Sequence, residues 1–253
     1  MLVFAVQLLC VIPARLGSTR LPHKPLRLLS GEPLVRLVTR RALELGVAQE
    51  VVVATDDQRI VDAVAPLGVE GVLTDPALRS GTERVAAVAG MARFARFDAV
   101  LNLQGDEPFL ARAAVEGAVE RVQGGDPIGT AAAPLAADDL TNPHRVKVVV
   151  DGRGHALRFS RALPASAAWS CEVVVRHHIG IYAYERRALL RWAALPEAAE
   201  ERAEGLEQVR PLAYGIPIGV GQIDVPAAPS VDTDEDLAAA ERYADTMSQR
   251  VGR

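Results

Sequence analysis

The feature that most constrains the fold is a regular alternation of apolar strand-like segments with segments of helical periodicity. Residues 3–12 form a continuous apolar run, and residues 34–45 show helical spacing that stops at Gly46. The alternation continues through strands predicted at 50–55, 69–73 and 99–103 and helices predicted at 57–67 and 82–94. This order predicts an α/β fold, a Rossmann-like and mostly parallel sheet with helices on both faces.

The pattern changes after residue 135, which predicts a second, smaller part of the chain. Residues 146–150 and 156–160 flank the turn Asp151–Gly154 and predict a β-hairpin. A long strand is expected at 172–184, and an Ala/Glu-rich stretch at 193–205 is expected to be a solvated helix or loop. The chain then returns with a strand at 216–223 and a last helix after Thr233. We therefore expect a main α/β domain from 1–135 and 215–253, and a mixed α/β subdomain from 136–214.

Composition excludes several classes of protein. The 253 residues are 49% apolar and 24% charged, which is the balance of an ordinary soluble protein. A net charge of -4 argues against nucleic-acid binding, which needs a basic surface. The apolar run at 3–12 is far shorter than the ~20 residues of a membrane span, so no membrane association is expected. Cys10 and Cys171 have neither metal-ligand spacing nor the number for a disulfide framework.

The loop after the first predicted strand, residues 13–26, has the composition of an anion site. It holds Arg15, Arg20 and Lys24 together with two hydroxyls and one glycine. Loops at the carboxyl end of a strand bind ligands in open α/β sheets, and these groups suit a triphosphate. Composition alone fits a solvated basic loop equally well. The dinucleotide and P-loop glycine fingerprints are missing from the sequence, which argues against hydride transfer and P-loop ATPase chemistry.

Two aspartates could hold a divalent cation. Asp106 follows a predicted strand through Gln104 and Gly105, which places its carboxylate at the ligand-binding edge of the sheet. Asp232 comes just before the last predicted helix, where sequence physics alone favours a helix N-cap. By the same reasoning, Thr82 is predicted to cap the helix that begins after Ser80 and Gly81.

A series of short motifs then occurs in the order found in one enzyme family. They include Leu21-Pro22-His23-Lys24-Pro25-Leu26, Ser80-Gly81-Thr82-Glu83-Arg84 and Asn102-Leu103-Gln104-Gly105-Asp106-Glu107-Pro108, with others at 12–15, 54–56, 142–149, 159–161, 178–182, 206–210 and 231–233. Together they resemble the cytidylyltransferases for 3-deoxy-manno-octulosonate (Kdo). The resemblance implies transfer of CMP from CTP to the anomeric hydroxyl of this acidic eight-carbon sugar, giving CMP-Kdo and pyrophosphate for lipopolysaccharide synthesis. It also implies Mg2+ as cofactor, a cytoplasmic location and a homodimer.

The resemblance also assigns site residues. It implies catalytic roles for Arg15, Lys24 and Asp106, and it gives Asp106 and Asp232 to the metal in place of a cap. The nucleotide residues that it implies are Pro13, Ala14, Arg15, Lys24, Arg79, Ser80, Gly81, Arg84 and Gln104. The sugar residues that it implies are Arg161, His178, Tyr182, Glu207 and Gln208, with the last two expected on a helix.

Some residues depart from the family pattern, and the departures keep other functions open. Leu78 stands where the family often has His, and His177 stands where it usually has Lys or Arg. The segment 162–169 is shorter than is usual in the family. These changes fall mainly on the sugar side, so an 8-amino Kdo analogue or another nonulosonate-like acid is an alternative acceptor. A metal-dependent glycosyltransferase is disfavoured because residues 104–107 are not a D-x-D motif. A nucleotide-sensing module would bind CTP without turnover.

Overall fold

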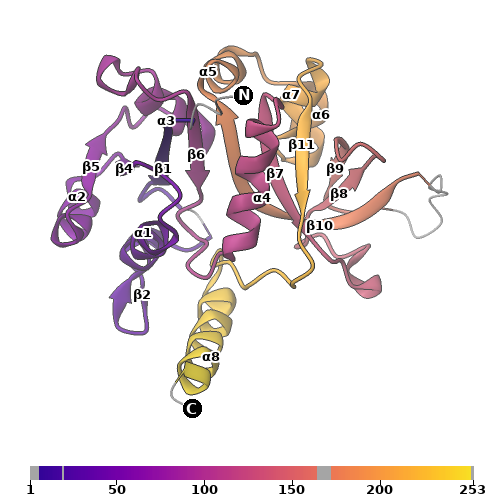
Figure 1. The fold of residues 1–253 in the computed structure, drawn as a ribbon. Helices are drawn as coiled ribbons and strands as arrows, with labels where there is room; N and C mark the ends of the chain where they lie inside the picture. Colours follow the sequence, from indigo (N-terminus) through magenta and orange to yellow (C-terminus); the bar gives the residue numbers. More distant parts are fainter. Residues whose placement is uncertain (1–5, 19, 164–171, 252–253) are drawn as a thin grey trace. The chain divides into compact units, whose positions relative to one another are not determined.

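The computed structural model describes residues 6–18, 20–163 and 172–251, which divide into two compact units. The first unit is formed mainly by Phe97–Leu101 and Ala111–Ala227. The second contains Gln7–Arg96, Asn102–Leu110 and Ala228–Arg253. The strand β6 (Ala99–Leu103) contributes residues to both units. Figure 1 labels the elements of each unit.

The second unit is built on the parallel strands β1 (Leu8–Ala14), β4 (Glu50–Thr55) and β5 (Glu70–Leu73). Every residue of β1 is buried, as expected for an apolar strand that is covered on both faces. The helices are α1 (Leu34–Leu45), α2 (Gln58–Val64), α3 (Gly81–Ala89) and α8 (Asp234–Val251), with short 3-10 turns at Lys24–Leu26, Ala65–Leu67 and Ala92–Phe94. A small hairpin, β2 (Leu28–Leu29) and β3 (Glu32–Pro33), precedes α1.

Two local predictions in this unit are wrong. The helix predicted at 82–94 ends at Ala89, because Gly90 is a poor interior helix residue, and a separate 3-10 turn follows it. The N-cap of α3 is Ser80 and not Thr82. The Ser80 hydroxyl accepts a hydrogen bond from the backbone N–H of Glu83 at 3.1 Å, while Thr82 lies inside the first turn.

The first unit contains a mixed sheet. Strand β7 (Ile128–Ala133) pairs in parallel with β11 (Ile218–Gln222) and antiparallel with β10 (Val174–Glu185). The predicted hairpin is confirmed as β8 (Lys147–Val150) and β9 (Ala156–Ser160), and β8 also pairs with β10. Three short helices follow β10: α5 (Arg186–Ala194), α6 (Ala199–Glu204) and α7 (Val209–Ala213).

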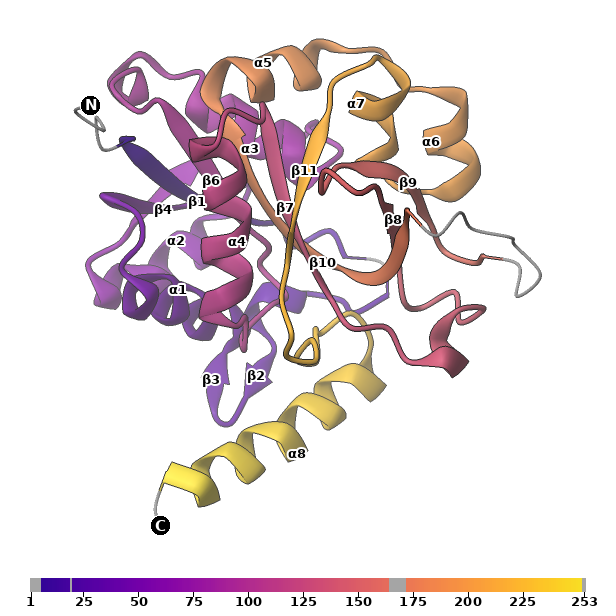
Figure 2. The ribbon, with the colours of Figure 1, turned by 45° about the vertical axis from the view of Figure 1, so that its right-hand side comes forward.

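Helix α4 (Arg112–Gln123), which the sequence analysis did not assign, packs across β7, β10 and β11 of this unit (Figure 2). Glycines make this packing close. A Cβ atom on Gly129 would lie 2.0 Å from the carbonyl oxygen of Ala118, and one on Gly221 would lie 2.5 Å from the backbone of Gly117. Only glycine allows the helix and strands to approach so closely.

The boundary between the compact units differs from the one drawn on the sequence. Because β7 pairs with both β10 and β11, residues 111–135 and 215–227 belong with 136–214 in the first unit. Pairing between strands far apart in the sequence decides this division, and the roles assigned to the two parts stay predictions.

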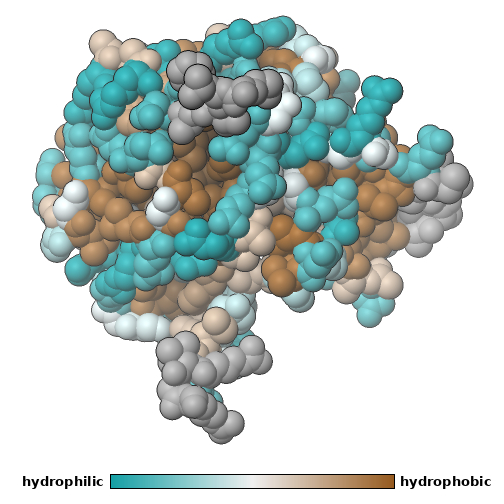
Figure 3. Space-filling view, viewed as in Figure 1, coloured by the Kyte–Doolittle hydropathy of each residue, from teal (hydrophilic) through white to brown (hydrophobic). Residues whose placement is uncertain are grey.

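Within the described residues, none of the helices has both the length and the apolar character of a membrane span. Helix α8 is long enough but carries charge along its length. Hydrophobic and hydrophilic patches alternate on the face drawn in Figure 3.

Candidate active site

A pocket in the second unit gathers most of the predicted nucleotide and metal residues. From the predicted set it is lined by Pro13, Ala14, Arg15, Lys24, Gly81, Arg84, Gln104, Asp106 and Asp232. Arg79 and Ser80 lie immediately before Gly81 but are outside the lining. The pocket also includes Ser18, Arg20, Pro25 and Gly105, which the sequence analysis did not assign to the site. Arg20 could have been identified, because it is one of three cations in the loop at 13–26.

The loops after β1 and β6 form the floor of this pocket, and a glycine brings them together. A Cβ atom on Gly105 would lie 2.7 Å from the carbonyl oxygen of Pro13, which is closer than a side chain allows. Gly105 therefore lets the Asp106 loop lie directly against the end of β1, next to Arg15. This explains why the sequence has glycine between Gln104 and Asp106.

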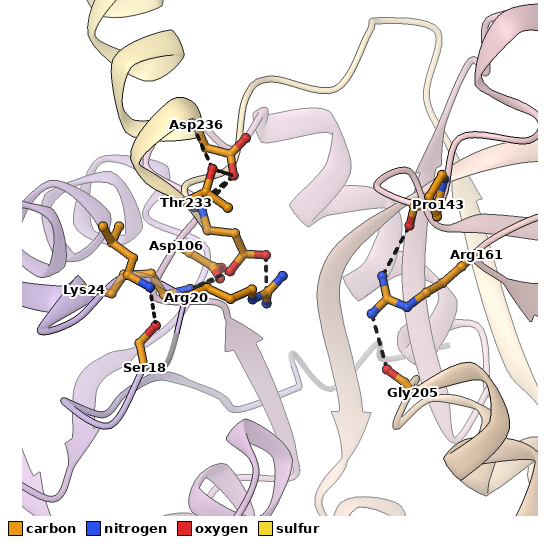
Figure 4. Close-up of polar contacts among 11 residues, drawn as sticks. Ser18, Arg20, Lys24, Asp106, Pro143, Arg161, Gly205, Thr233 and Asp236 are labelled. Carbon is orange, nitrogen blue, oxygen red and sulfur yellow. Dashed lines mark hydrogen bonds and ion pairs between the residues drawn. The ribbon is translucent and has the colours of Figure 1, made fainter.

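Lys24 lies between the two predicted metal ligands. Its ammonium donates to Oδ2 of Asp106 at 2.7 Å (Figure 4) and to Oδ1 of Asp232 at 2.9 Å. Arg20 forms a second ion pair with Asp232 at 3.2 Å. Burial pushes the pKa of Lys24 down, but the two carboxylates outweigh it and leave that pKa above its ordinary value. Lys24 is therefore charged and is held by carboxylates.

Asp232 does not cap helix α8, so the expectation from sequence physics alone is wrong. The Thr233 hydroxyl accepts from the backbone N–H of Asp236 at 3.1 Å, and the Asp236 carboxylate accepts from the backbone N–H of Thr233 at 3.0 Å. This reciprocal capping box satisfies the start of the helix. A backbone hydrogen bond from Val231 to the carbonyl of Asp106, at 3.0 Å, places the Asp232 side chain beside Asp106.

The acidic pair fits a magnesium ion. Mg2+ is bound in proteins through one or two carboxylates, and substrate phosphates and water complete its shell. Asp106 and Asp232 already hold a cationic group in common. In the described part of the chain, no group of three or more His, Cys, Asp or Glu side chains could form a cage made of protein alone. The donor set suits an ion that arrives with a phosphate ligand.

The predicted arginines occupy different environments. Arg84 is almost fully buried; its guanidinium contacts the Thr74 hydroxyl and lies 3.5 Å from Oδ2 of Asp56. Burial lowers the pKa of Arg84, and Asp56 acts in the opposite direction. Arg15 is exposed and donates to the carbonyl of Arg79 at 3.2 Å, which links the first loop to the residues before α3. The amide of Gln104 donates to Oδ1 of Asn102 at 3.0 Å.

The predicted sugar residues all belong to the first unit, and three of them, His178, Tyr182 and Gln208, are buried. His178 is 7% exposed, and its Nε2 lies 3.0 Å from the Thr130 hydroxyl. Because that hydroxyl donates to the carbonyl of Ile181 at 2.7 Å, the imidazole must donate from Nε2. Burial lowers the pKa of His178 to about 3, so the ring is neutral. Tyr182 packs between the rings of His178 and Trp192, and burial raises its pKa well above the ordinary value.

Glu207 and Gln208 lie in the turn before α7 and not on a helix as predicted. A bidentate ion pair holds this turn, with Arg210 donating to the two carboxylate oxygens of Glu201 at 2.7 and 2.6 Å. Glu201 is 5% exposed, so the prediction that the whole stretch 193–205 is solvated is wrong at this residue. Gln208 is also buried, which a surface helix would not explain.

Arg161 lies against the turn at residues 204–205. Its Nε donates to the carbonyl of Glu204 at 3.1 Å, and its two terminal nitrogens donate to the carbonyls of Pro143 and Gly205 at 3.4 Å each (Figure 4). Arg161 therefore contacts residues that lie just before the Glu207–Gln208 turn. His177, which departs from the family pattern, is half-buried, and burial lowers its pKa to about 4. Most of the shortened segment, from residue 164 to 169, lies outside the described residues.

Comparison with known proteins extends over nearly the whole chain. A family model described as cytidylyltransferase matches residues 9–218. The 3-deoxy-manno-octulosonate cytidylyltransferase of Gemmatimonas aurantiaca is 49% identical over 245 residues, covering 94% of this chain and 95% of the relative. The protein of the same description from Stenotrophomonas maltophilia strain R551-3 is 44% identical and covers 94% and 97%. The chain belongs to the 3-deoxy-manno-octulosonate cytidylyltransferase family.

Solved structures agree with the family and the fold class. The structure of CMP:2-keto-3-deoxy-manno-octonic acid synthetase complexed with CTP matches with a TM-score of 0.84 and 37% identity, over 96% of this chain and 99% of that one. The predicted α/β class with a mostly parallel sheet is confirmed. A 4-diphosphocytidyl-2C-methyl-D-erythritol synthase from Anaerococcus prevotii matches with a TM-score of 0.64 at 9% identity, which shows the fold alone.

Proposed function

We propose that this chain is an enzyme that transfers CMP from CTP to the anomeric hydroxyl of Kdo, giving CMP-Kdo and pyrophosphate. The observation that carries the proposal is 49% identity to a Kdo cytidylyltransferase over almost the full length of both chains. The pocket supports it with cationic side chains and the carboxylate pair Asp106 and Asp232.

The residues of the second unit account for the nucleotide side of the reaction. Arg15 and Lys24 offset the negative charge of the triphosphate and of the leaving pyrophosphate. Gln104 and the backbone around Gly81 orient the cytidine part. A bound Mg2+, held by Asp106 and Asp232, would stabilise charge on the α-phosphate and lower the pKa of the attacking hydroxyl.

The residues of the first unit account for the sugar side. Arg161 offers a cation for the sugar carboxylate, and Glu207 and Gln208 offer hydrogen-bonding groups for its hydroxyls. His178 is neutral and donates to Thr130, so its role is to pack and orient the groups around it. It is not a general base. Cytoplasmic location, a role in lipopolysaccharide synthesis and a homodimer are parts of the same proposal. Exposed Leu157 on β9 and Val174 on β10 are candidates for a dimer contact.

The test is pyrophosphate release from CTP in the presence of Mg2+ and a panel of acidic sugars. The proposal expects release that depends on both CTP and Kdo, with CMP-Kdo identified by mass spectrometry. Faster turnover of an 8-amino Kdo analogue or of a nonulosonate would assign a different acceptor and keep the chemistry. CTP binding without pyrophosphate release from any sugar would favour the nucleotide-sensing alternative. Transfer of a sugar from a nucleotide sugar would identify a glycosyltransferase.

A further inference from the structure

Lys147 is a buried cation on β8, far in sequence from the carboxylate pair. Its side chain is inaccessible to solvent, although the other three residues of the strand are valines. Burial lowers the pKa of Lys147, and the charge of Asp139 partly offsets this effect. An isolated buried charge is costly, so a lysine in an otherwise apolar strand requires compensating contacts.

The compensation comes from the backbone. The ammonium donates to the carbonyl oxygens of Asn142, Arg145 and Arg161, the latter two at 2.7 and 2.6 Å. An ammonium has three N–H donors, so these three carbonyls use all of them. Hydrogen bonds to a charged group are stronger than neutral ones. Lys147 thus fixes the turn at 142–145 to the backbone that follows β9.

The segments that Lys147 fixes take part in holding the Arg161 side chain. One of them supplies Arg161 itself, and the turn at 142–145 supplies the Pro143 carbonyl that accepts from its guanidinium. On its other side, Arg161 is held through its backbone N–H by the Glu204 carboxylate at 3.1 Å. Over the described residues, three of the five N–H donors of the Arg161 guanidinium bind the carbonyls of Glu204, Pro143 and Gly205. Two donors are left for a ligand.

We propose that Lys147 is a positioning residue for sugar binding, which holds Arg161 and its receiving turn in the geometry that meets the sugar carboxylate. This inference rests on the proposed function. A guanidinium must present its N–H groups in a fixed plane to bind a carboxylate, and small displacements of such groups weaken binding and catalysis strongly. Lys147 keeps the Arg161 guanidinium in that plane through its backbone contacts, and it does not itself contact the sugar.

The experiment compares Lys147→Met with Val149→Ala, a buried apolar position on the same strand. Lys147→Met keeps an unbranched side chain, shorter by one heavy atom, and removes all three donors. We expect the KM for Kdo to rise by roughly tenfold or more, while the KM for CTP stays within about twofold of wild type. Val149→Ala should lower the thermal midpoint and leave both KM values unchanged, because it weakens the strand without releasing Arg161.

If Lys147→Met does not fold, Lys147→Gln replaces it, because its amide keeps two donors; a smaller rise in the KM for Kdo is then expected. Unchanged KM values in a folded variant would overturn the role of Lys147 while leaving the proposed function intact. An equal rise for Val149→Ala would also overturn it, since general weakening of β8 would then suffice. A wild-type protein without Kdo-dependent pyrophosphate release would overturn the proposed function and, with it, this role.

Discussion

At the scale of single residues, the pocket of the second unit is organised around one lysine and two aspartates. Lys24 occupies the space between Asp106 and Asp232, where a divalent cation bound by both carboxylates would also lie. Two cations cannot share that position, since like charges repel strongly at short range. A divalent cation held by the two carboxylates would therefore compete with Lys24, and the phosphates of CTP would offer Lys24 another partner.

This exchange gives a prediction that does not depend on turnover. Lys24→Met should bind Mn2+ at least about tenfold more tightly than wild type in the absence of nucleotide, because an internal competitor is removed. Free Mn2+ can be titrated by electron paramagnetic resonance. Arg20→Met is the matched control: Arg20 pairs with Oδ2 of Asp232, whereas Lys24 contacts Oδ1 and also Asp106, so a smaller change is expected. Equal tightening in both variants would show a general charge effect and no competition for one position.

Asp106→Asn should reduce the rate of pyrophosphate release by at least ~100-fold, the scale of losing a main electrostatic stabiliser. The amide keeps the shape of the carboxylate but loses its charge, so circular dichroism should show an unchanged fold. Asp234→Asn is the control, because this exposed aspartate pairs with Arg27 at the start of α8. Activity of the Asp106 variant within a few-fold of wild type would contradict the metal assignment.

At the scale of elements, helix ends and turns place the side chains that the reaction needs. The start of α8 is satisfied by Thr233 and Asp236, which leaves the Asp232 carboxylate for Lys24 and Arg20. On the other unit, the buried pair of Glu201 and Arg210 closes the segment that contains Gln208. The capping box and the Glu201–Arg210 pair both act over a short stretch of chain. The first places Asp232, and the second places Gln208.

Thr233→Ala should lower the free energy of unfolding by about 1 kcal/mol, the usual contribution of an N-cap hydroxyl. Urea denaturation followed by far-ultraviolet circular dichroism measures this change. Thr233→Ser should restore stability, because serine keeps the hydroxyl that accepts from Asp236. A loss of stability in the serine variant as large as in the alanine variant would show that methyl packing, and not capping, is responsible.

Gln208→Ala should raise the KM for the sugar by roughly three- to tenfold, the effect of one lost hydrogen bond to a neutral group. The KM for CTP should not change, because the nucleotide residues belong to the other unit. Glu200→Ala, at an exposed position of α6, is the control and should leave both constants unchanged. A shift confined to CTP would show that the sugar and nucleotide residues are assigned to the wrong units.

At the scale of the whole molecule, buried histidines couple stability to pH. Burial holds the pKa of His178 at about 3, against an ordinary value of 6.5 in the unfolded chain. Between these two values the unfolded state binds the proton and the folded state does not, so stability falls as pH falls through that window. The slope approaches about 1.4 kcal/mol per pH unit for one such group. His177 acts in the same direction over a narrower window.

Urea denaturation at about pH 7, 6 and 5 should therefore show a progressive loss of stability in the wild-type protein. His178→Gln should lose less stability over the same interval, because it keeps a donor for Thr130 and cannot be protonated. His144→Gln, at an exposed position, should behave like wild type. An unchanged pH profile in His178→Gln would mean that other groups cause the acid sensitivity.

The sequence by itself determined the local elements and the chemical groups of the site. Helix α1 and strands β4 and β6 have the predicted bounds, because apolar periodicity, Gly46 and short polar turns act over a few residues. The ordered motifs identified the family and most of the residues that line the pocket, since each motif is contiguous in the chain.

Only the tertiary structure decided the contacts between distant segments. Strand pairing put residues 111–135 and 215–227 with the smaller part of the chain, and the meeting of the loops at 106 and 232 placed Lys24 between two carboxylates. Lys147 reads in the sequence as one polar residue before three valines, and its contact with the Arg161 carbonyl forms only because β8 and β9 pair. Local patterns carry no information on which distant groups satisfy a buried charge, because that depends on the register and packing of the whole unit.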